Sequence, residues 1–326
     1  MARELDMAQW QSELVDAFHW GDEERVRALV ARECKARPRE ARATLEEMLE
    51  SPEVRVRQAA ALALGTWGGP SSTRRLEQQL VLEEARGNDS SSVVQVILQS
   101  LGQIKSASAR AALVRKLTRL AAGTPEQTDV NDLTYALWRK RHPELIPPVR
   151  SALQRIPPPT ARALRALLRL LESTPEQLIA WVEDESVPLE DKTEVLIVLD
   201  EEVPAEWERL LPSLISRARA VIDVATTRDG EENEFCERLL TLLLLHRERL
   251  IPALTLESRS ALRGVALRLA VAPTALRSIG AAVTLQYVGQ REDAELLEAH
   301  RPQDDVLGKV FDDTVLALRN HPLRKD

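Results

Sequence analysis

Two apolar segments of this chain end in the same Leu-Gly pair, and their glycines, Gly65 and Gly102, lie 37 residues apart. The segments are EVRVRQAAALALG over 53–65 and SVVQVILQSLG over 92–102, and LRSIGAAVTLQYVG over 276–289 ends similarly in Val-Gly. We expect each glycine to adopt the left-handed conformation that ends a helix, before a polar linker and a second amphipathic segment. A helical hairpin recurring at this period cannot bury both faces alone, so its copies are expected to stack into a solenoid.

Helix signals dominate the remainder of the chain. Ala, Leu, Arg and Glu fill nearly every window, and β-branched or aromatic residues seldom alternate with polar ones. Prolines, which suit the first helical turn, precede or open the apolar segments; they are Pro38, Pro52, Pro70, Pro125, Pro143, Pro175, Pro188, Pro204, Pro252, Pro273 and Pro302. We therefore predict an all-α protein of roughly fourteen to seventeen helices in antiparallel pairs.

A family resemblance lies in the first of these hairpins. Residues 41–65, which end in SPEVRVRQAAALALG, resemble a HEAT repeat, in which a turn with Pro or Asp precedes Val-Arg and an Ala/Leu-rich second helix. Residues 90–102, and more loosely 289–318, resemble the same pattern. The resemblance implies a right-handed α-solenoid of stacked antiparallel helix pairs, and such arrays host many functions.

The expected organisation is one HEAT-like solenoid domain over residues 1–326. The polar stretch Thr226 to Asn233 is interpreted as an inserted loop between longer helices. The expected parts are N-terminal capping helices over 1–38, the most regular repeats over 39–200, longer helices with the inserted loop over 201–250, and C-terminal repeats with a cap over 251–326.

Composition narrows the class of protein. The chain has 326 residues, 44% of them hydrophobic, and a net charge of −7, which argues against disorder. Two cysteines cannot form a disulfide framework, and no stretch approaches the roughly 18 apolar residues of a membrane span, so we expect a cytoplasmic protein. Of 44 Lys and Arg only seven are Lys, which indicates a GC-rich bacterial genome and weakens the case for any single arginine being functional.

No arrangement of residues indicates catalysis. The five histidines are scattered, and none lies at zinc-ligand spacing from another His or Cys. HEAT-like hydroxylases that hold a di-iron centre have arrays of His-Glu pairs, whereas this chain has no His-Glu dipeptide. Cys34 lies among Arg32, Lys35 and Arg37, which would lower a thiol pKa, but a helix-end cysteine of ordinary reactivity is the simpler interpretation. We expect no catalytic residue, no metal and no cofactor.

Tryptophan is unusually frequent beside two Tyr and three Phe. HEAT-like alkylpurine DNA glycosylases use concave-face aromatics with an acid and an arginine, and that resemblance points to Trp138 with Asp132 and Arg139, or to Trp181 with Asp184. Tryptophan in helical arrays more often fills gaps between helix layers. The stacking site is therefore the weaker of the two interpretations.

Charge is distributed unevenly along the chain. Residues 102–171 hold thirteen Lys and Arg against four acids, a net of +9, whereas residues 172–208 hold thirteen acids and one Lys, a net of −12. Arg162, Arg165 and Arg169 recur at helical spacing and share one face. Such a stripe would bind phosphates or an acidic partner, although a solvated outer face would look the same in the sequence.

Two functions compete on these grounds. The leading hypothesis is a non-enzymatic scaffold or adaptor whose concave, charged surface binds another protein. The alternative is a nucleic-acid-binding protein resembling the HEAT-like DNA glycosylases, and a HEAT-like bilin lyase shares only the fold. The predicted partner-binding residues are Arg139, Lys140, Arg150, Arg155, Arg162, Arg165 and Arg169.

Overall fold

The structure is a computed structural model, and it describes residues 6–87, 90–224, 230–271 and 275–320. Within these ranges the chain folds into nineteen α-helices and short 3-10 segments without a strand. The chain divides into two compact units, an N-terminal unit of residues 1–171 and a C-terminal unit of residues 172–326. The all-α solenoid is thereby confirmed, whereas the single domain over 1–326 and its internal boundaries stay predictions.

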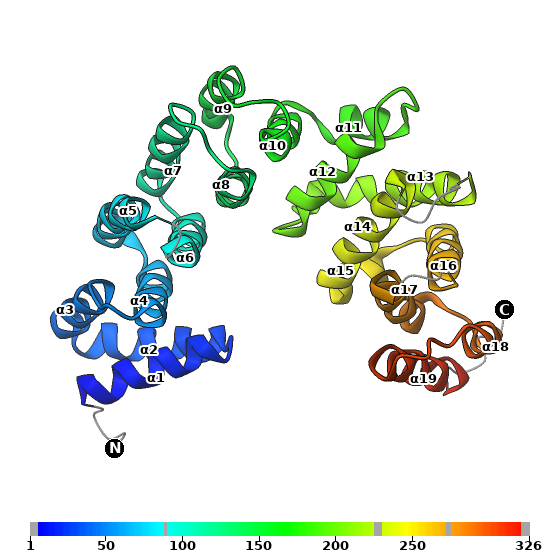
Figure 1. Cartoon of the computed structure of the whole chain (residues 1–326), viewed down its shortest axis with the longest axis horizontal. Coiled ribbons are helices and arrows are strands. Elements are labelled where there is room, and N and C mark those ends of the chain that lie inside the picture. The colour runs from blue at the N-terminus through cyan, green and yellow to red at the C-terminus, as the bar shows by residue number, and fades with distance from the viewer. Residues whose placement is uncertain (1–5, 88–89, 225–229, 272–274, 321–326) are drawn as a thin grey trace. The chain divides into compact units, whose positions relative to one another are not determined.

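The N-terminal unit is a curved double layer of helices (Figure 1). Helices α4, α6 and α8 pack side by side in its inner layer, and α5, α7 and α9 form the outer layer. Its helices are α1 (Met7–His19), α2 (Glu23–Ala36), α3 (Pro38–Leu49), α4 (Val54–Trp67), α5 (Gly69–Arg86), α6 (Ser91–Gln103), α7 (Ala107–Leu120), α8 (Gln127–Arg139), the 3-10 segment η2 (Pro143–Leu145), α9 (Ile146–Leu153) and α10 (Arg162–Glu172).

The C-terminal unit repeats the two-layer plan. Helices α12, α14, α17 and α19 pack in sequence in one layer, α11, α13 and α16 form the other, and α18 packs on α19. Its elements are α11 (Pro175–Glu183), α12 (Leu189–Asp200), the 3-10 segment η3 (Ala205–Leu210), α13 (Leu211–Val224), α14 (Glu231–Leu245), α15 (Arg247–Ala253), α16 (Leu256–Ala270), α17 (Ala275–Val288), α18 (Asp293–Ala299) and α19 (Asp305–Asn320).

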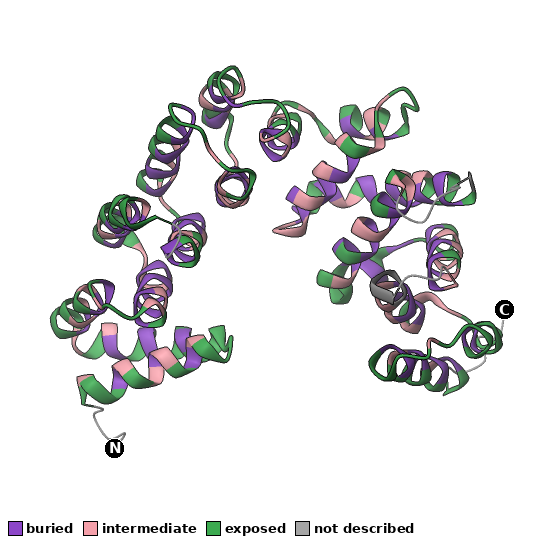
Figure 2. Cartoon of the chain, in the orientation of Figure 1, coloured by how far each residue is buried: buried purple, intermediate pink, exposed green. Residues whose placement is uncertain are grey.

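Each helix buries one apolar stripe between the layers, and Figure 2 shows these stripes facing the neighbouring helices. Helix α4 is the extreme case, because Ala59 through Gly65 are all buried. Small and branched apolar residues fill this core, so its stability comes from burial rather than from helix propensity alone.

The glycines at the 37-residue spacing do not end helices, contrary to the prediction. Gly65 and Gly102 lie inside α4 and α6, and neither has a positive φ; α4 ends instead at Gly68, with a φ of 74°. A Cβ on Gly65 would lie 2.5 Å from the Cβ of Ser100, and one on Gly102 would lie 3.3 Å from the Cα of Ala136. The glycines are therefore needed because adjacent inner helices approach closely there.

The same contacts explain why the N-terminal unit curves. Small residues hold α4, α6 and α8 close together, whereas outer helices α5 and α7 are joined through long ionic side chains such as Arg115 and Glu77. The inner helices meet near their C-terminal ends in the same register, so they run parallel. The unit therefore bends with α4, α6 and α8 on its inner side (Figure 1).

The predicted number of helices was too low, because several continuous apolar stretches are broken. Residues 204–226 contain a 3-10 segment before α13, and the stretch 231–247 is interrupted at His246, between α14 and α15. Pro212 lies in the first turn of α13, where its ring disfavours a helix continuous with the 3-10 segment, whereas Pro252 lies inside α15. Residues 226–229 of the predicted loop Thr226 to Asn233 lie outside the described residues, and its last three residues belong to α14, which begins at Glu231.

Candidate protein-interaction surface

The solvent-accessible side of α4, α6 and α8 forms the inner face of the N-terminal unit. Its polar side chains are exposed or half-buried and recur every three or four residues along α6 and α8, whereas on α4 buried residues separate Gln58 from Thr66. They are Arg55, Gln58 and Thr66 on α4; Ser92, Gln95, Gln99 and Gln103 on α6; and Thr128, Asp132, Tyr135 and Arg139 on α8.

The 37-residue period places equivalent inner-face residues side by side. Gln95 Nε2 on α6 donates a hydrogen bond to Asp132 Oδ1 on α8 at 3.3 Å, and these two residues are 37 apart. Gln58 occupies the same position one period earlier, on α4. A row of polar side chains therefore crosses the three parallel helices.

Two of the predicted binding residues lie where α8 ends. Arg139 is the last residue of α8 and Lys140 its C-cap, and both are half-buried. Arg139 lies one 37-residue period after Gly102, and its Cδ would be 3.3 Å from a Cβ on that glycine. The aliphatic part of Arg139 thus covers Gly102 at the edge of the inner face.

Helix α10 places three predicted residues on one side. Arg165 and Arg169 are exposed and Arg162 is half-buried, opposite the buried stripe Ala163 to Leu170. Arg165 Nη1 donates to the carbonyl oxygen of Pro158 at 2.7 Å, which ties α10 to the segment before it. The shared face predicted from the spacing is present, and its binding role stays a prediction.

The remaining predicted residues lie before α10. Arg150 is exposed on α9, and Arg155 is exposed in the segment that follows that helix. Both add positive charge to the end of the N-terminal unit, but they come from a different element than Arg162, Arg165 and Arg169.

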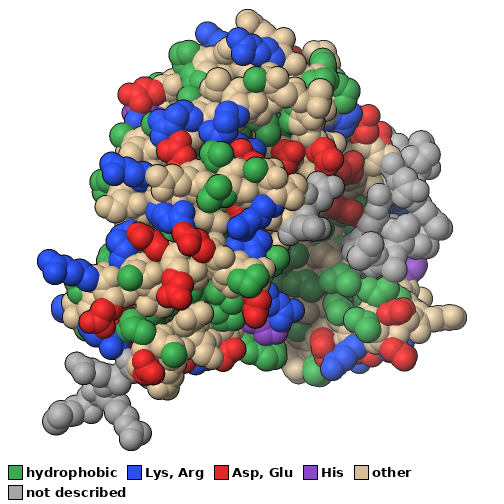
Figure 3. Space-filling view, turned by 60° about the vertical axis from the view of Figure 1, so that its left-hand side comes forward, with side chains coloured by type: hydrophobic (Ala, Val, Ile, Leu, Met, Phe, Trp, Pro, Cys, Tyr) green, Lys and Arg blue, Asp and Glu red, His purple; other side chains and the backbone are tan. Residues whose placement is uncertain are grey.

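Two carboxylates of α5 neutralise a part of the net positive charge of residues 102–171 on the outer layer. Arg115 on α7 binds Glu77 on α5 through two hydrogen bonds, of 2.5 and 2.7 Å, and this contact lowers the pKa of Glu77. Lys116 and Arg119 both pair with Glu84 of α5, at 3.0 and 3.3 Å. In Figure 3 basic and acidic side chains interleave over the forward face.

The sequence count missed this neutralisation because Glu77 and Glu84 lie before residue 102. Arg115 and Glu77 are 38 apart, close to the repeat period, so that spacing was the signal that would have found the pair.

The acidic segment 172–208 is also partly neutralised, within the C-terminal unit. Glu185 pairs with Arg217 of α13 at 3.0 Å, and Glu208 pairs with Arg249 at 3.4 Å. Lys192 is fully buried, and its Nζ donates to the carbonyl oxygen of Asp184 at 2.7 Å. Burial lowers the pKa of Lys192, so this lysine has a structural role.

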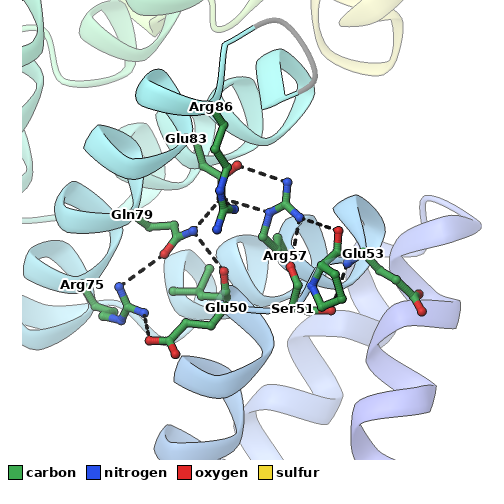
Figure 4. Close-up of polar contacts among 10 residues, drawn as sticks. Glu50, Ser51, Glu53, Arg57, Arg75, Gln79, Glu83 and Arg86 are labelled. Carbon is green, nitrogen blue, oxygen red and sulfur yellow. Dashed lines mark hydrogen bonds and ion pairs between the residues drawn. The ribbon is translucent and has the colours of Figure 1, made fainter.

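A buried polar network that the sequence did not reveal joins α3, α4 and α5 (Figure 4). The guanidinium of Arg57 lies 3.0 Å from a carboxylate oxygen of Glu83 and donates to the carbonyl oxygens of Ser51 and Pro52, each at 2.9 Å. Gln79 Nε2 donates to Glu83 and to the carbonyl oxygen of Leu49. These bonds satisfy most of the buried polar atoms, although Nε of Arg57 lacks a hydrogen-bond partner, so we assign the network a stabilising role in the repeat.

The structure disfavours the tryptophan sites. Trp138 is 1% exposed in the core, with the guanidinium of Arg141 5.0 Å from its ring centre, whereas Asp132 contacts Gln95 on the inner face. The ring of Trp138 therefore has no open side on which a base would stack. Trp181 is half-buried, and the neighbouring carboxylate of Asp184 accepts hydrogen bonds from Ser186.

The cysteines lack the environment of reactive thiols. Burial raises the pKa of Cys34 to about 12 despite the nearby Arg42, and burial also raises the pKa of Cys236. Among the residues that the structure describes, no three His, Cys, Asp or Glu side chains converge as metal ligands. Within the same ranges, every helix is too short or too polar to cross a membrane.

Comparisons with known proteins agree with the helical arrangement. A family model of HEAT repeats matches residues 12–86, which span α1 to α5 and include the buried network. A search among curated proteins finds no match. Residues 12–86 therefore match HEAT repeats, and the stacked helices that follow within each unit fit the same kind of architecture.

Proposed function

We propose that this chain is a non-enzymatic scaffold that binds a partner protein through the inner face and the arginines of α10. HEAT repeats are commonly protein-interaction scaffolds. The observation that carries the proposal is the row of accessible polar side chains across α4, α6 and α8, exemplified by Gln95 and Asp132. The cores of these helices are closed without this row, so packing between the layers does not require it.

Charge supports an acidic partner at the α10 end. Arg165 and Arg169 are exposed and Arg162 is half-buried, all on one helix face. Guanidinium groups bind carboxylates with well-defined geometry, and complementary charge increases the association rate and fixes orientation. Exposed acidic side chains on the partner would meet these arginines.

The nucleic-acid alternative is weaker on this surface. Helix α6, at the centre of the inner face, contains no charged residue, and α4 contributes only Arg55 to that face. A polyphosphate backbone needs a cation near most phosphates along its path. The chain as a whole is also acidic, with a net charge of −7.

Affinity capture from native lysate tests the proposal, with nuclease added to one arm. The test variant reverses Arg162, Arg165 and Arg169 to Glu, and the control reverses Arg39, Arg74 and Lys105, which are exposed on or beside the outer layer. We expect a protein partner that survives nuclease, is lost with the α10 variant and is kept by the control. Capture that depends on nucleic acid, or that both variants retain, would reject the proposal.

A further inference from the structure

The last helix that the structure describes, α19, carries exposed apolar residues on the side away from its neighbours. It packs against α17 and α18 (Figure 1), and Thr314 Oγ1 donates a hydrogen bond to the carbonyl oxygen of Ala282 on α17 at 3.3 Å. Val306 is 71% exposed and Leu316 is 61% exposed. Together with three exposed polar residues they form what we call the outer stripe, which consists of Val306, Lys309, Asp313, Leu316 and Asn320.

We propose that the outer stripe of α19 pairs with the outer stripe of a second copy of this chain. The two α19 helices run antiparallel, and the contact forms a two-fold symmetric dimer. This inference goes beyond the proposed function and does not depend on it, because α19 belongs to the C-terminal unit and the inner face belongs to the N-terminal unit.

The first step is the spacing of the outer stripe. Its five residues follow one another at intervals of three, four, three and four residues. Because an α-helix has 3.6 residues per turn, this spacing keeps all five on one narrow side of the helix. It is the spacing of the contact positions in a pair of helices that pack knobs into holes. The outer stripe therefore has the form of a helix-pairing seam.

The second step is the symmetry of that spacing. Val306 and Leu316 each lie five residues from Phe311, and Lys309 and Asp313 each lie two residues from it. A two-fold axis that crosses α19 at the level of Phe311 therefore places Val306 opposite Leu316 of the second copy. The same axis places Lys309 opposite Asp313 of the second copy. One stripe is thus complementary to itself, as a two-fold interface requires.

The third step is the charge at the centre of the stripe. Among the described residues, the ion pairs of α19 are made by Asp312 and Arg319, and none is made by Lys309 or Asp313. The antiparallel arrangement gives each of these two residues a partner of opposite charge in the second copy. A parallel arrangement would place lysine beside lysine and aspartate beside aspartate. Charge therefore selects the antiparallel arrangement and fixes its register.

The remaining charges of α19 lie on one flank of the stripe. The two-fold axis brings Asp312 of both copies near each other, but Arg301 neutralises each one by donating to both carboxylate oxygens, at 2.8 and 2.9 Å. Farther from the axis, Asp305 lies opposite Arg319 of the second copy, although Arg319 also binds Glu298 of its own chain at 2.7 Å. This flank therefore adds no uncompensated repulsion.

The apolar part of the contact is small. It consists of Val306 and Leu316, with the half-buried Val310 and Ala317 on the flank opposite the charges. One helix of 16 residues from each copy buries less than the roughly 1,200 Å² of a standard interface. We therefore expect a weak dimer, with a Kd of about 10–100 µM.

Sedimentation velocity of the full chain, from about 2 to about 500 µM, tests this inference. The first variants are Leu316→Glu and Val306→Glu, which place a carboxylate in the apolar part of the stripe. The matched control is Leu256→Glu, because Leu256 is 78% exposed at the start of α16 and the charge change is the same. Melting temperatures equal to that of the wild type would show that the variants are folded.

We expect the wild type to form dimers within this range. Either Leu316→Glu or Val306→Glu should weaken the dimer at least about tenfold, because two charges enter each interface. Leu256→Glu should dimerise as the wild type does.

A charge exchange tests the register. Lys309→Asp and Asp313→Lys should each be monomeric alone, because like charges then face each other across the two-fold axis. An equimolar mixture of the two variants should form dimers again, because every aspartate of one variant then faces a lysine of the other.

The inference is overturned if the wild type stays monomeric over the whole range. It is also overturned if Leu316→Glu and Val306→Glu dimerise as tightly as the wild type, or if Leu256→Glu weakens the dimer as much as they do. A mixture of Lys309→Asp and Asp313→Lys that stays monomeric would reject the antiparallel register.

Discussion

The two units each bury a carboxylate, and they do so differently. Glu83 in the N-terminal unit is fully buried; burial acts to raise its pKa, but hydrogen bonds from Ser90, Gln79 and Arg57 outweigh it, so the pKa is lowered. In the C-terminal unit, Asp200 Oδ1 is buried without a hydrogen-bond partner, and burial raises the pKa of Asp200 to about 7. The supply of donors, more than burial itself, decides which carboxylate stays ionised.

A second difference concerns glycines inside the helices of the two units. Gly65 on α4 faces Ser100 of α6 so closely that a Cβ would overlap it, whereas Gly280 on α17 has no heavy atom of another element within 4 Å of such a Cβ. The N-terminal unit thus uses glycine for helix contact, and the C-terminal unit has at least one helical glycine without that role.

The largest expected effect comes from breaking the Glu83 network. Glu83→Ala leaves the guanidinium of Arg57 buried without its carboxylate, which should lower the free energy of unfolding by about 3–5 kcal/mol. Urea denaturation followed by circular dichroism measures this.

The matched control for this experiment is the double variant Arg57→Met with Glu83→Leu, which removes both charges. It should recover part of the lost stability because no unpaired charge remains. A single-variant loss below about 1 kcal/mol would mean that solvent reaches the network and that the contrast with Asp200 is overstated.

The glycine comparison predicts changes of opposite sign. Gly65→Ala should destabilise by about 1–3 kcal/mol, since α4 and α6 must separate. Gly280→Ala should stabilise by about 0.5–1 kcal/mol, because it reduces the freedom of the unfolded chain in a helical position with room. Thermal unfolding of both variants measures these changes, and a loss of stability in Gly280→Ala would refute the prediction of opposite signs.

A smaller effect is expected from pH at Asp200. Its folded pKa of about 7 lies above the ordinary 3.8, so the folded state binds more protons between these values. Its contribution therefore makes stability fall as pH rises from about 4 to about 7. Asp200→Asn should flatten this part of the profile of melting temperature against pH.

Glu83 supplies the opposite slope. Its lowered pKa means that its contribution to stability is present above the ordinary value of 4.5 and is lost as pH falls through the folded pKa.

The prediction for Asp200 is contradicted if the melting temperature of Asp200→Asn still declines from pH 4 to 7 as steeply as that of the wild type. Such a profile would show that Asp200 is solvated in the folded protein.

The smallest effect on folding is expected at the exposed charges of α10. Reversing Arg162, Arg165 and Arg169 to Glu should change the free energy of unfolding by only about 0–1 kcal/mol per residue. Differential scanning fluorimetry beside the capture experiment separates folding from binding. A melting temperature as low as that of Glu83→Ala would show that these side chains are part of the core packing.

Local patterns predicted the elements of this fold, and tertiary contacts decided the roles of individual residues. The helices, their pairing and the shared face of Arg162, Arg165 and Arg169 follow from periodicity within a few turns. The role of Gly65 depends on Ser100, 35 residues away, and helix-ending glycine is the commoner pattern.

The same limit applies to the candidate surface. Arg115 looked like part of a basic surface because its partner Glu77 lies on another helix, and Trp138 looked available because nothing local shows which side of α8 packs inward. The glutamines of α6 were missed because uncharged polar residues carry no signal until neighbouring helices place them in rows.

The Arg57 network also bears on how the repeat opens to solvent. Its guanidinium holds the turn at Ser51 and Pro52 and simultaneously binds Glu83, near the end of α5. Amide protons at the end of α3 and throughout α5 are therefore expected to exchange with deuterium as one cooperative group. Local unfolding in this part of the array would then expose the end of α3 and the whole of α5 together. The smallest segment that unfolds here is therefore larger than one helical hairpin.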